Sequence, residues 1–147
     1  MIPSPLALQT HFFTKVAVEA CPEACDAADD GDLSTSVEFQ QHEEDSQKWL
    51  VNLGVCREKS SEEEGCPEYT FNVQIFGVFG VDEDYPAEKA DKLVRANAPA
   101  MLYGAVREML LNVTGRGPFG PCTLPTVSFI DEAERTSDSE PARGNEE

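Results

Sequence analysis

Residues 97–131 read NAPAMLYGAVREMLLNVTGRGPFGPCTLPTVSFID, and their pattern is the strongest indication of the fold in this sequence. Its first half repeats apolar side chains at steps of three and four residues, the spacing of one face of an α-helix. We therefore predict a helix that buries this stripe against a sheet or another subunit, with Arg107, Glu108 and Asn112 facing water. The predicted buried stripe consists of Met101, Ala105, Val106, Met109, Leu110 and Val113.

The second half of the stretch is punctuated by glycine and proline. Gly115 stands where a helix commonly ends in a left-handed residue, since glycine adopts positive φ without steric cost. Gly117, Pro118, Gly120 and Pro121 then prevent the chain from resuming a helix or entering the centre of a sheet. Because no catalytic residue accompanies this pattern, it favours a scaffold for binding.

Four segments upstream alternate apolar and polar side chains, as β-strands buried on one face do. Residues 10–20 place Phe12, Val16 and Val18 on one face, and Val37 and Phe39 share a face of a short second strand. The expected apolar faces of the other two strands are Trp49, Val51, Leu53 and Val55, and Tyr69, Phe71, Val73, Ile75, Phe79 and Val81.

The polar links between these strands favour an antiparallel meander covered by the later helix, which is an α+β fold. Residues 86–96 predict a further helical segment that Pro99 kinks or interrupts. We expect one domain over residues 1–131: a four-stranded antiparallel sheet packed by a long helix. Residues 132–147 show no apolar period and end in acidic residues, so we expect a disordered acidic tail.

The order and spacing of these segments resemble the SecB family of bacterial protein-export chaperones. The family's long helix carries a Tyr-x-x-Ala/Val-Arg-Glu core, followed by an Arg-Gly turn with Pro and Phe and by a Leu-x-Pro-x-x-Phe-Asp ending. Its first strand is similar to HFFTKVAVEACPEA at residues 11–24. The matching positions of the helix and return segment are Ala98 to Ala100, Tyr103, Val106, Arg107, Glu108, Arg116, Gly117, Pro118, Phe119, Leu124, Pro125, Phe129 and Asp131.

The resemblance implies a surface groove that holds extended, unfolded chains through apolar contacts and performs no covalent chemistry. Its client-binding positions here are Leu33, Val37 and Phe39, with Leu33 expected in a loop where the family often has an aromatic residue. The alternative is that all three are ordinary core residues.

The resemblance also implies an acidic face on the first and fourth strands that docks the export motor SecA. The counterparts are Val16, Ala20 and Asn72, of which none is acidic, although Glu19 is adjacent. The expected motor-docking face is therefore Val16, Glu19 and Asn72, and only Glu19 supplies the expected charge.

Charge and composition exclude several classes of partner. The formal net charge of −17 argues against nucleic acid, because neutralising phosphates needs basic patches, and it favours a basic partner. No apolar run is long enough to span a bilayer, and the N-terminus lacks the basic and apolar regions of a secretory signal. We therefore expect no membrane insertion and a cytoplasmic location.

The sequence predicts no enzyme, cofactor or metal. It contains no phosphate-cradling glycine motif and no nucleophile with a histidine in a recognisable arrangement. The odd count of five cysteines without paired spacing suits reduced thiols. A Cys-x-x-x-Cys spacing alone is a weak zinc signal, so we expect no metal site. The cysteines are Cys21, Cys25, Cys56, Cys66 and Cys122.

The main hypothesis is an ATP-independent holdase that binds unfolded precursor proteins for export. One sheet and one helix cover only part of the apolar area, and the SecB resemblance implies a homotetramer built as a dimer of dimers, with SecA as a further candidate partner. Two alternatives remain open: a client-specific chaperone of a toxin-antitoxin module, and a non-chaperone protein-interaction subunit.

Overall fold

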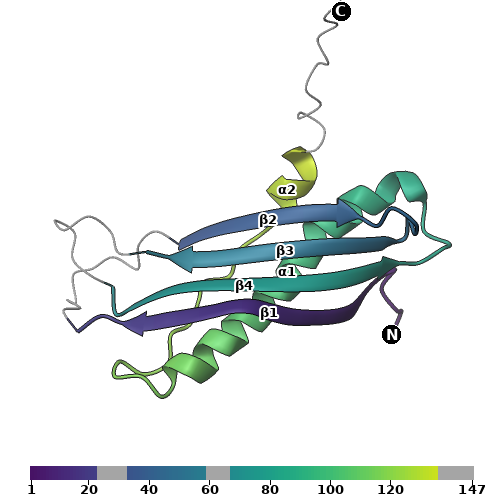
Figure 1. The fold of residues 1–147 in the computed structure, drawn as a ribbon. Coiled ribbons are helices and arrows are strands. Elements are labelled where there is room, and N and C mark those ends of the chain that lie inside the picture. The colour runs from purple at the N-terminus through teal and green to yellow at the C-terminus, as the bar shows by residue number, and fades with distance from the viewer. Residues whose placement is uncertain (23–32, 59–66, 136–147) are drawn as a thin grey trace, which may run out of the picture.

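The computed structural model describes residues 1–22, 33–58 and 67–135. Within these ranges the chain forms four strands and two helices (Figure 1). The strands are β1 (Leu6–Ala20), β2 (Leu33–Gln41), β3 (Lys48–Arg57) and β4 (Tyr69–Val81), and the helices are α1 (Ala87–Thr114) and α2 (Ile130–Arg135). The predicted α+β fold, an antiparallel sheet packed by a long helix, is confirmed.

The sheet has the order β1-β4-β3-β2, and all neighbours are antiparallel. Only β2, β3 and β4 form the expected meander; the expectation that β1 continues it beside β2 is wrong. β1 instead pairs with β4 along its length, from Leu6 opposite Val81 to Ala20 opposite Tyr69. An alternating strand fits beside any other alternating strand, so the pattern alone does not choose the neighbour. β1 and β2 are therefore the two edges of the sheet.

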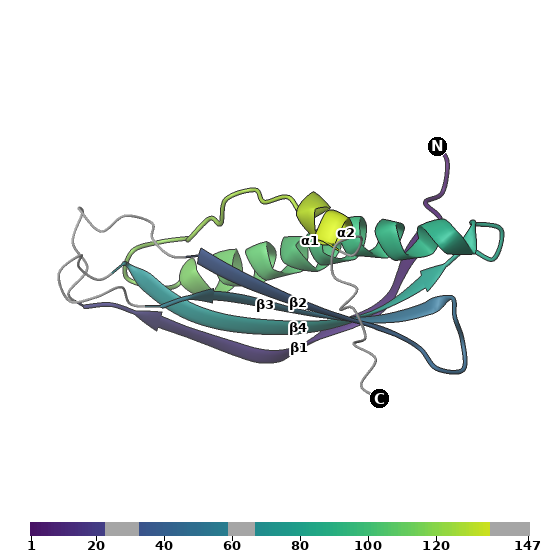
Figure 2. The ribbon, with the colours of Figure 1, turned by 90° about the horizontal axis from the view of Figure 1, so that it is seen from above.

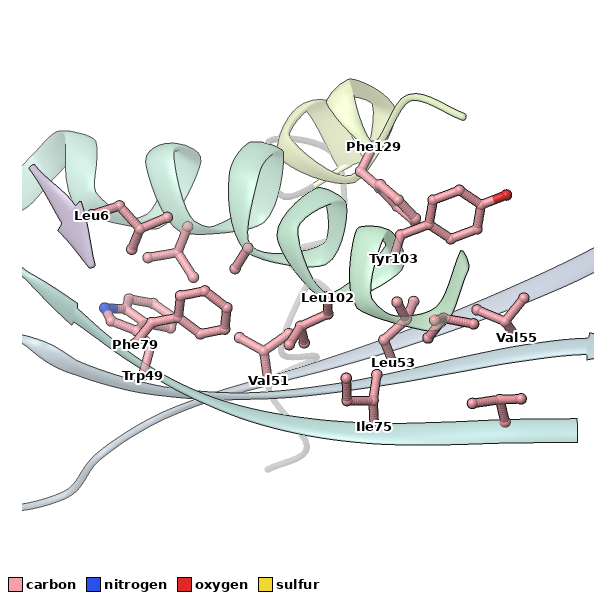
Figure 3. Packing of buried hydrophobic residues seen from close by; sticks show 14 of the residues in the cluster. Leu6, Trp49, Val51, Leu53, Val55, Ile75, Phe79, Leu102, Tyr103 and Phe129 are labelled. Carbon is pink, nitrogen blue, oxygen red and sulfur yellow. The ribbon is translucent and has the colours of Figure 1, made fainter. Parts of the chain in front are cut away.

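The molecule has two layers, with α1 running obliquely across one face of the sheet (Figures 1 and 2). We call this face inner and the opposite face outer. The apolar residues predicted for β3 and β4 all point inward and are buried, as Figure 3 shows for Val51, Leu53 and Ile75 beneath Leu102 of α1. Phe76 and Val78 of β4 lie on the outer face and are half-buried.

The buried stripe of α1 differs from the prediction. Val106 and Leu110 are buried as expected, but Met101 and Val113 are each 41% exposed. The helix buries every fourth residue, and a step of four residues at 3.6 residues per turn advances the stripe around the helix by about 40°. Towards its end the helix also contacts the return segment, where Thr114 Oγ1 accepts the N–H of Cys122, so the sheet does not cover the whole stripe. Its members are Ala90, Val94, Ala98, Leu102, Val106, Leu110 and Thr114.

Pro99 and Gly115 also behave differently from the prediction. α1 continues through Pro99, which is buried, so the expectation that it interrupts the helix is wrong. Gly115 has φ −58° and donates its N–H to the Leu111 carbonyl, so it ends the helix in a right-handed conformation. The glycine with positive φ is Gly120, at 73°, five residues further along.

Two register shifts reorganise β1. The shift between Phe13 and Lys15 lets one extra residue into the strand and exchanges the faces that follow it. Phe12 therefore points outward, paired with Phe76 at 5.2 Å between ring centroids, whereas Val16 and Val18 point inward. The prediction that Phe12 shares a face with Val16 and Val18 is wrong because simple alternation cannot anticipate a bulge.

Two tyrosines fix the segment that returns after α1. The Tyr69 hydroxyl donates to the Gly120 carbonyl at 2.9 Å and accepts the Phe119 N–H at 3.0 Å. The Tyr103 hydroxyl donates to the Pro125 carbonyl at 2.6 Å. The chain then enters α2, whose residues 132–135 are helical and correct the expectation that residues 132–147 form only a disordered tail; residues 136–147 lie outside the described part.

Candidate functional site

The three predicted client-binding residues form one strip on β2. Leu33, Val37 and Phe39 alternate along the strand and face inward, opposite Arg57, Leu53 and Val51 of β3. All three are half-buried and pack against the core. Leu33 begins β2, so its expected place in a loop is wrong. We call Leu33, Val37 and Phe39 the β2 strip.

The β2 strip remains half-exposed because of its place at the sheet edge. α1 packs mainly against β1, β3 and β4, and α2 packs against α1. β2 lies at the margin of this cover, and its outward edge has no neighbouring strand in the described part of the chain. The strip therefore combines apolar side chains with an available row of backbone N–H and C=O groups.

An arginine accompanies each end of the β2 strip. Arg95 of α1 lies 4.6 Å from the centre of the Phe39 ring and pairs with Asp91 at 3.0 Å. Arg57 ends β3 opposite Leu33 and lies 5.3 Å from the centre of the Phe71 ring. The sequence analysis missed both residues. For Arg57 a signal existed, since it occupies the next inward position of β3 after Val55.

The Tyr103 hydroxyl lies within reach of two cations, Arg57 and Arg107. Burial raises the pKa of Tyr103, and the positive charges of Arg107 and Arg57 oppose that shift more weakly. The hydroxyl therefore stays protonated near neutral pH and keeps donating to Pro125. Figure 3 shows its ring beside Phe129, and the two centroids are 5.9 Å apart. This pair anchors the return segment on α1.

Besides the β2 strip, the structure has a pocket at the end of the sheet, where β1, β3 and β4 meet. This open pocket has a volume of about 420 Å³ and is lined by residues that include Glu19, Asn72, Cys56, Arg57 and Glu58. Burial raises the pKa of the Cys56 thiol, and the neighbouring Glu58 carboxylate raises it further. The pocket therefore keeps Cys56 in its protonated form near neutral pH.

Cysteine chemistry departs from the prediction at one position. Cys56 and Cys122 are outside any disulfide, but Cys21 is disulfide-bonded, so the expectation of reduced thiols is wrong for Cys21. The spacing of cysteines along the sequence does not show which of them lie close enough in the folded chain to form a disulfide. Within the described residues, no group of histidine, cysteine, aspartate and glutamate side chains is arranged to hold a metal ion. No described helix is both long and apolar enough to cross a membrane.

Comparison with known proteins places this architecture in a family. The family described as "Preprotein translocase subunit SecB" matches residues 4–132. The chain belongs to the SecB family. The resemblance read from the sequence is thereby confirmed over nearly the whole of the described chain.

One SecB protein matches part of this chain in sequence. The protein-export protein SecB of Anaplasma phagocytophilum (strain HZ) is 31% identical over 68 residues, which are 45% of this chain and 43% of that protein. This match therefore spans less than half of the relative's length.

Two solved structures share the SecB-like fold. A Mycobacterium tuberculosis SecB-like chaperone, in complex with a ChAD peptide from the HigA1 antitoxin, is 18% identical with a TM-score of 0.54, covering 84% of this chain and 91% of that one. A protein of unknown function from Streptococcus agalactiae is 14% identical with a TM-score of 0.54, covering 82% and 97%.

The residues that the SecB resemblance assigned to motor docking do not share one face. Glu19 and Asn72 both face outward and line the pocket at the end of the sheet. Val16 is paired with the buried Val73 and faces inward. The structure thus brings together two of the three predicted residues.

Proposed function

We propose that this SecB family member is an ATP-independent holdase that binds unfolded polypeptides in extended form. The observation that carries the proposal is the β2 strip, a half-exposed row of apolar side chains on an edge strand at the margin of the helical layer. The proposed role is non-enzymatic and cytoplasmic, and its partners are unfolded precursor proteins.

The physical basis is the match between an edge strand and an extended client. A client segment can hydrogen-bond to the free edge of β2 while alternate side chains reach Leu33, Val37 and Phe39. Apolar area removed from water contributes about 25 cal/mol per Å² regardless of the client's sequence. Backbone pairing is equally independent of sequence. Such a surface suits a chaperone that must accept many unfolded chains.

Assembly as a dimer of dimers is part of the proposal. Met101 and Leu111 of α1 are 41% and 37% exposed on the side away from the sheet, and Gly104 between them leaves open space within 4 Å of where a Cβ would stand. Apolar side chains beside a small residue allow two helices to approach closely. A second copy of the same helix is the partner that supplies a complementary face.

Met101→Glu is expected to weaken this assembly while leaving the protomer folded. The residue is exposed and glutamate is a good helix former, so the helix tolerates it, but a buried like-charge pair at a symmetric contact does not. We expect association roughly tenfold weaker or worse. Sedimentation velocity across a concentration series measures this, with Ala87→Glu as the control that adds the same charge at an exposed position in the first turn. Equal sedimentation of both variants and the parent would place the subunit contact elsewhere.

The holdase proposal is tested by suppression of aggregation. A chemically denatured test protein is diluted into buffer with chaperone at substoichiometric to equal tetramer ratios, without nucleotide, and light scattering is followed. We expect scattering to fall in proportion to tetramer concentration. An unrelated acidic protein of similar net charge is the control, because negative charge alone can improve solubility. Light scattering as high as without chaperone, at one tetramer per molecule of test protein, would contradict the proposal.

A narrower client range is the second candidate, and one observation favours it. The M. tuberculosis neighbour is described as bound to a peptide from an antitoxin. We therefore propose a client-specific chaperone of a toxin-antitoxin module as the alternative. Mass spectrometry of polypeptides that copurify from cells separates the readings: many unfolded precursors support the general holdase, and one antitoxin supports the narrow one. A single folded partner would identify an interaction subunit instead.

SecA is the further partner that we propose for the general holdase. Glu19 and Asn72 support this proposal, because both line the pocket at the end of the sheet. Glu58 adds a second carboxylate to the same pocket. A basic segment of the motor would complement this pair of acids.

A further inference from the structure

Arg57 is a buried cation, and no acidic residue in the described part of the chain forms an ion pair with it. Its side chain is only 7% exposed, and its Nε has no hydrogen-bond partner. Within the described residues it forms no ion pair, although acidic residues outnumber basic ones 28 to 11 in this chain. Glu19 and Glu58 line the same pocket, yet neither pairs with it.

The buried Nε of Arg57 is costly, because its N–H has lost water without gaining a hydrogen-bond acceptor. The Phe71 ring at 5.3 Å offsets part of this cost through a cation–π contact, but a ring accepts none of the N–H hydrogen bonds in the plane of the guanidinium. Arg95 at the other end of the β2 strip differs, since Asp91 already binds its Nε. The two ends of the strip therefore differ in chemistry.

Charges of both signs lie near Arg57, because Glu19 and Glu58 line its pocket and a second arginine acts on the same tyrosine. The positive charges of Arg107 on α1 and Arg57 on β3 both lower the pKa of Tyr103, and Arg57 lies opposite Leu33 in the pairing of β2 with β3. The Tyr103 hydroxyl is committed to the Pro125 carbonyl and is uncharged near neutral pH. This end of the β2 strip thus offers N–H donors and positive charge within a strongly acidic protein.

We propose that Arg57 is a carboxylate-binding site at the Leu33 end of the β2 strip. It would bind an acidic side chain or the C-terminal carboxylate of a client segment whose apolar residues lie along Leu33, Val37 and Phe39. A guanidinium presents a planar fork that matches both oxygens of a carboxylate, and the low exposure of Arg57 strengthens such a pair. The inference rests on the proposed function and narrows its preferred client to apolar segments ending in an acid.

The test uses matched synthetic peptides of nine residues, the length of β2, with alternating apolar side chains. One carries Glu at the end and a second carries Gln there, both with amidated C-termini; a third is the Gln peptide with a free carboxylate. Affinities are measured by fluorescence anisotropy for the parent protein, Arg57→Met, Arg57→Lys and Arg116→Gln. Arg116 is exposed, so its change removes the same single charge without touching the β2 strip.

We expect the parent to bind the Glu peptide roughly tenfold more tightly than the Gln peptide. The ratio of the two affinities, Glu peptide over Gln peptide, should fall to about one in Arg57→Met. It should fall only partly in Arg57→Lys, which keeps the charge but lacks the planar fork, and it should stay unchanged in Arg116→Gln. Tighter binding of the free-carboxylate peptide would assign the site to chain termini, and tighter binding of the Glu peptide to side chains.

A ratio near one in the parent overturns the inference, as does an unchanged ratio in Arg57→Met. Circular dichroism checks that Arg57→Met folds, which we expect because an apolar side chain of similar volume often replaces a buried charge without loss. If Arg57→Met fails to fold, the affinity ratio of the parent and the change of that ratio in Arg57→Lys still test the inference. Binding of the Gln peptide separates the two proposals: no binding of any peptide contradicts the holdase, whereas equal binding of all contradicts only the carboxylate site.

Discussion

Leu102→Ala is expected to lower the free energy of unfolding by about 3 kcal/mol, within the range of about 2–5 kcal/mol measured for buried leucines. Leu102 is fully buried in the middle of α1. Its methyl groups fill the space above Gly77, where an added Cβ would stand 2.8 Å from Leu102 Cδ2. Truncation leaves a cavity between the helix and β4 that neither rigid element can close.

The effect of Leu102→Ala is measured by urea denaturation followed through Trp49, the only tryptophan, which is buried in the same core. Leu111→Ala on the same helix is the control, because Leu111 is 37% exposed and should cost less than about 1 kcal/mol. Both variants are compared at one protomer concentration, since assembly contributes to apparent stability. Equal losses in both would mean that α1 presents a different face to the sheet.

Phe39→Asp is expected to weaken client binding by roughly tenfold or more while the assembly stays intact. The ring is half-buried on the inner face of the edge strand β2, so it offers a client apolar area that an aspartate replaces with charge. Its cation–π partner Arg95 is held by Asp91 and does not need the ring. Competition binding with an unfolded test protein measures the loss, and sedimentation velocity monitors the assembly.

Gln40→Asp is the matched control for Phe39→Asp. It introduces the same charge one residue along β2, but on the outer face, where Gln40 is exposed. We expect client binding close to that of the parent. If Phe39→Asp dissolves the assembly or unfolds the protomer, Phe39 is a core residue and the β2 strip is not the client site.

Alternation in β3 and β4 predicted their buried residues correctly because both strands lie inside the sheet. Each has a strand on either side and α1 across one face, so every second side chain is buried without exception. β1 lacks a neighbour on one edge, and a bulge costs little there. Its prediction failed at Phe12, where the register shift before Lys15 separates neighbours that a regular strand would keep on one face.

The candidate site shows the same division between local pattern and long-range contact. Alternation predicted that Val37 and Phe39 share one face of a strand, and the SecB resemblance implied that both, together with Leu33, are client-binding positions. Arg57 was not found. Alternation puts it at the next inward position after Val55, but nothing in the sequence shows that it packs over Phe71 without a carboxylate partner among the described residues. Whether an arginine has an acidic partner depends on which side chains lie close to it in the folded chain. This sequence contains many acidic residues, but none of the described ones forms an ion pair with Arg57.

Periodicity and glycine–proline punctuation act over a few residues, so the sequence was sufficient to predict the four strands, the long helix, the packing of helix on sheet and, through the SecB resemblance, the family. It did not predict α2 or the continuation of α1 through Pro99. The three-dimensional fold was needed to show that β1 pairs with β4, that α1 buries every fourth residue, and that Met101 is exposed. The physical reason is that strand pairing and helix crossing angle are set by the twist of the whole sheet, and that twist selects which of several similar apolar residues is buried.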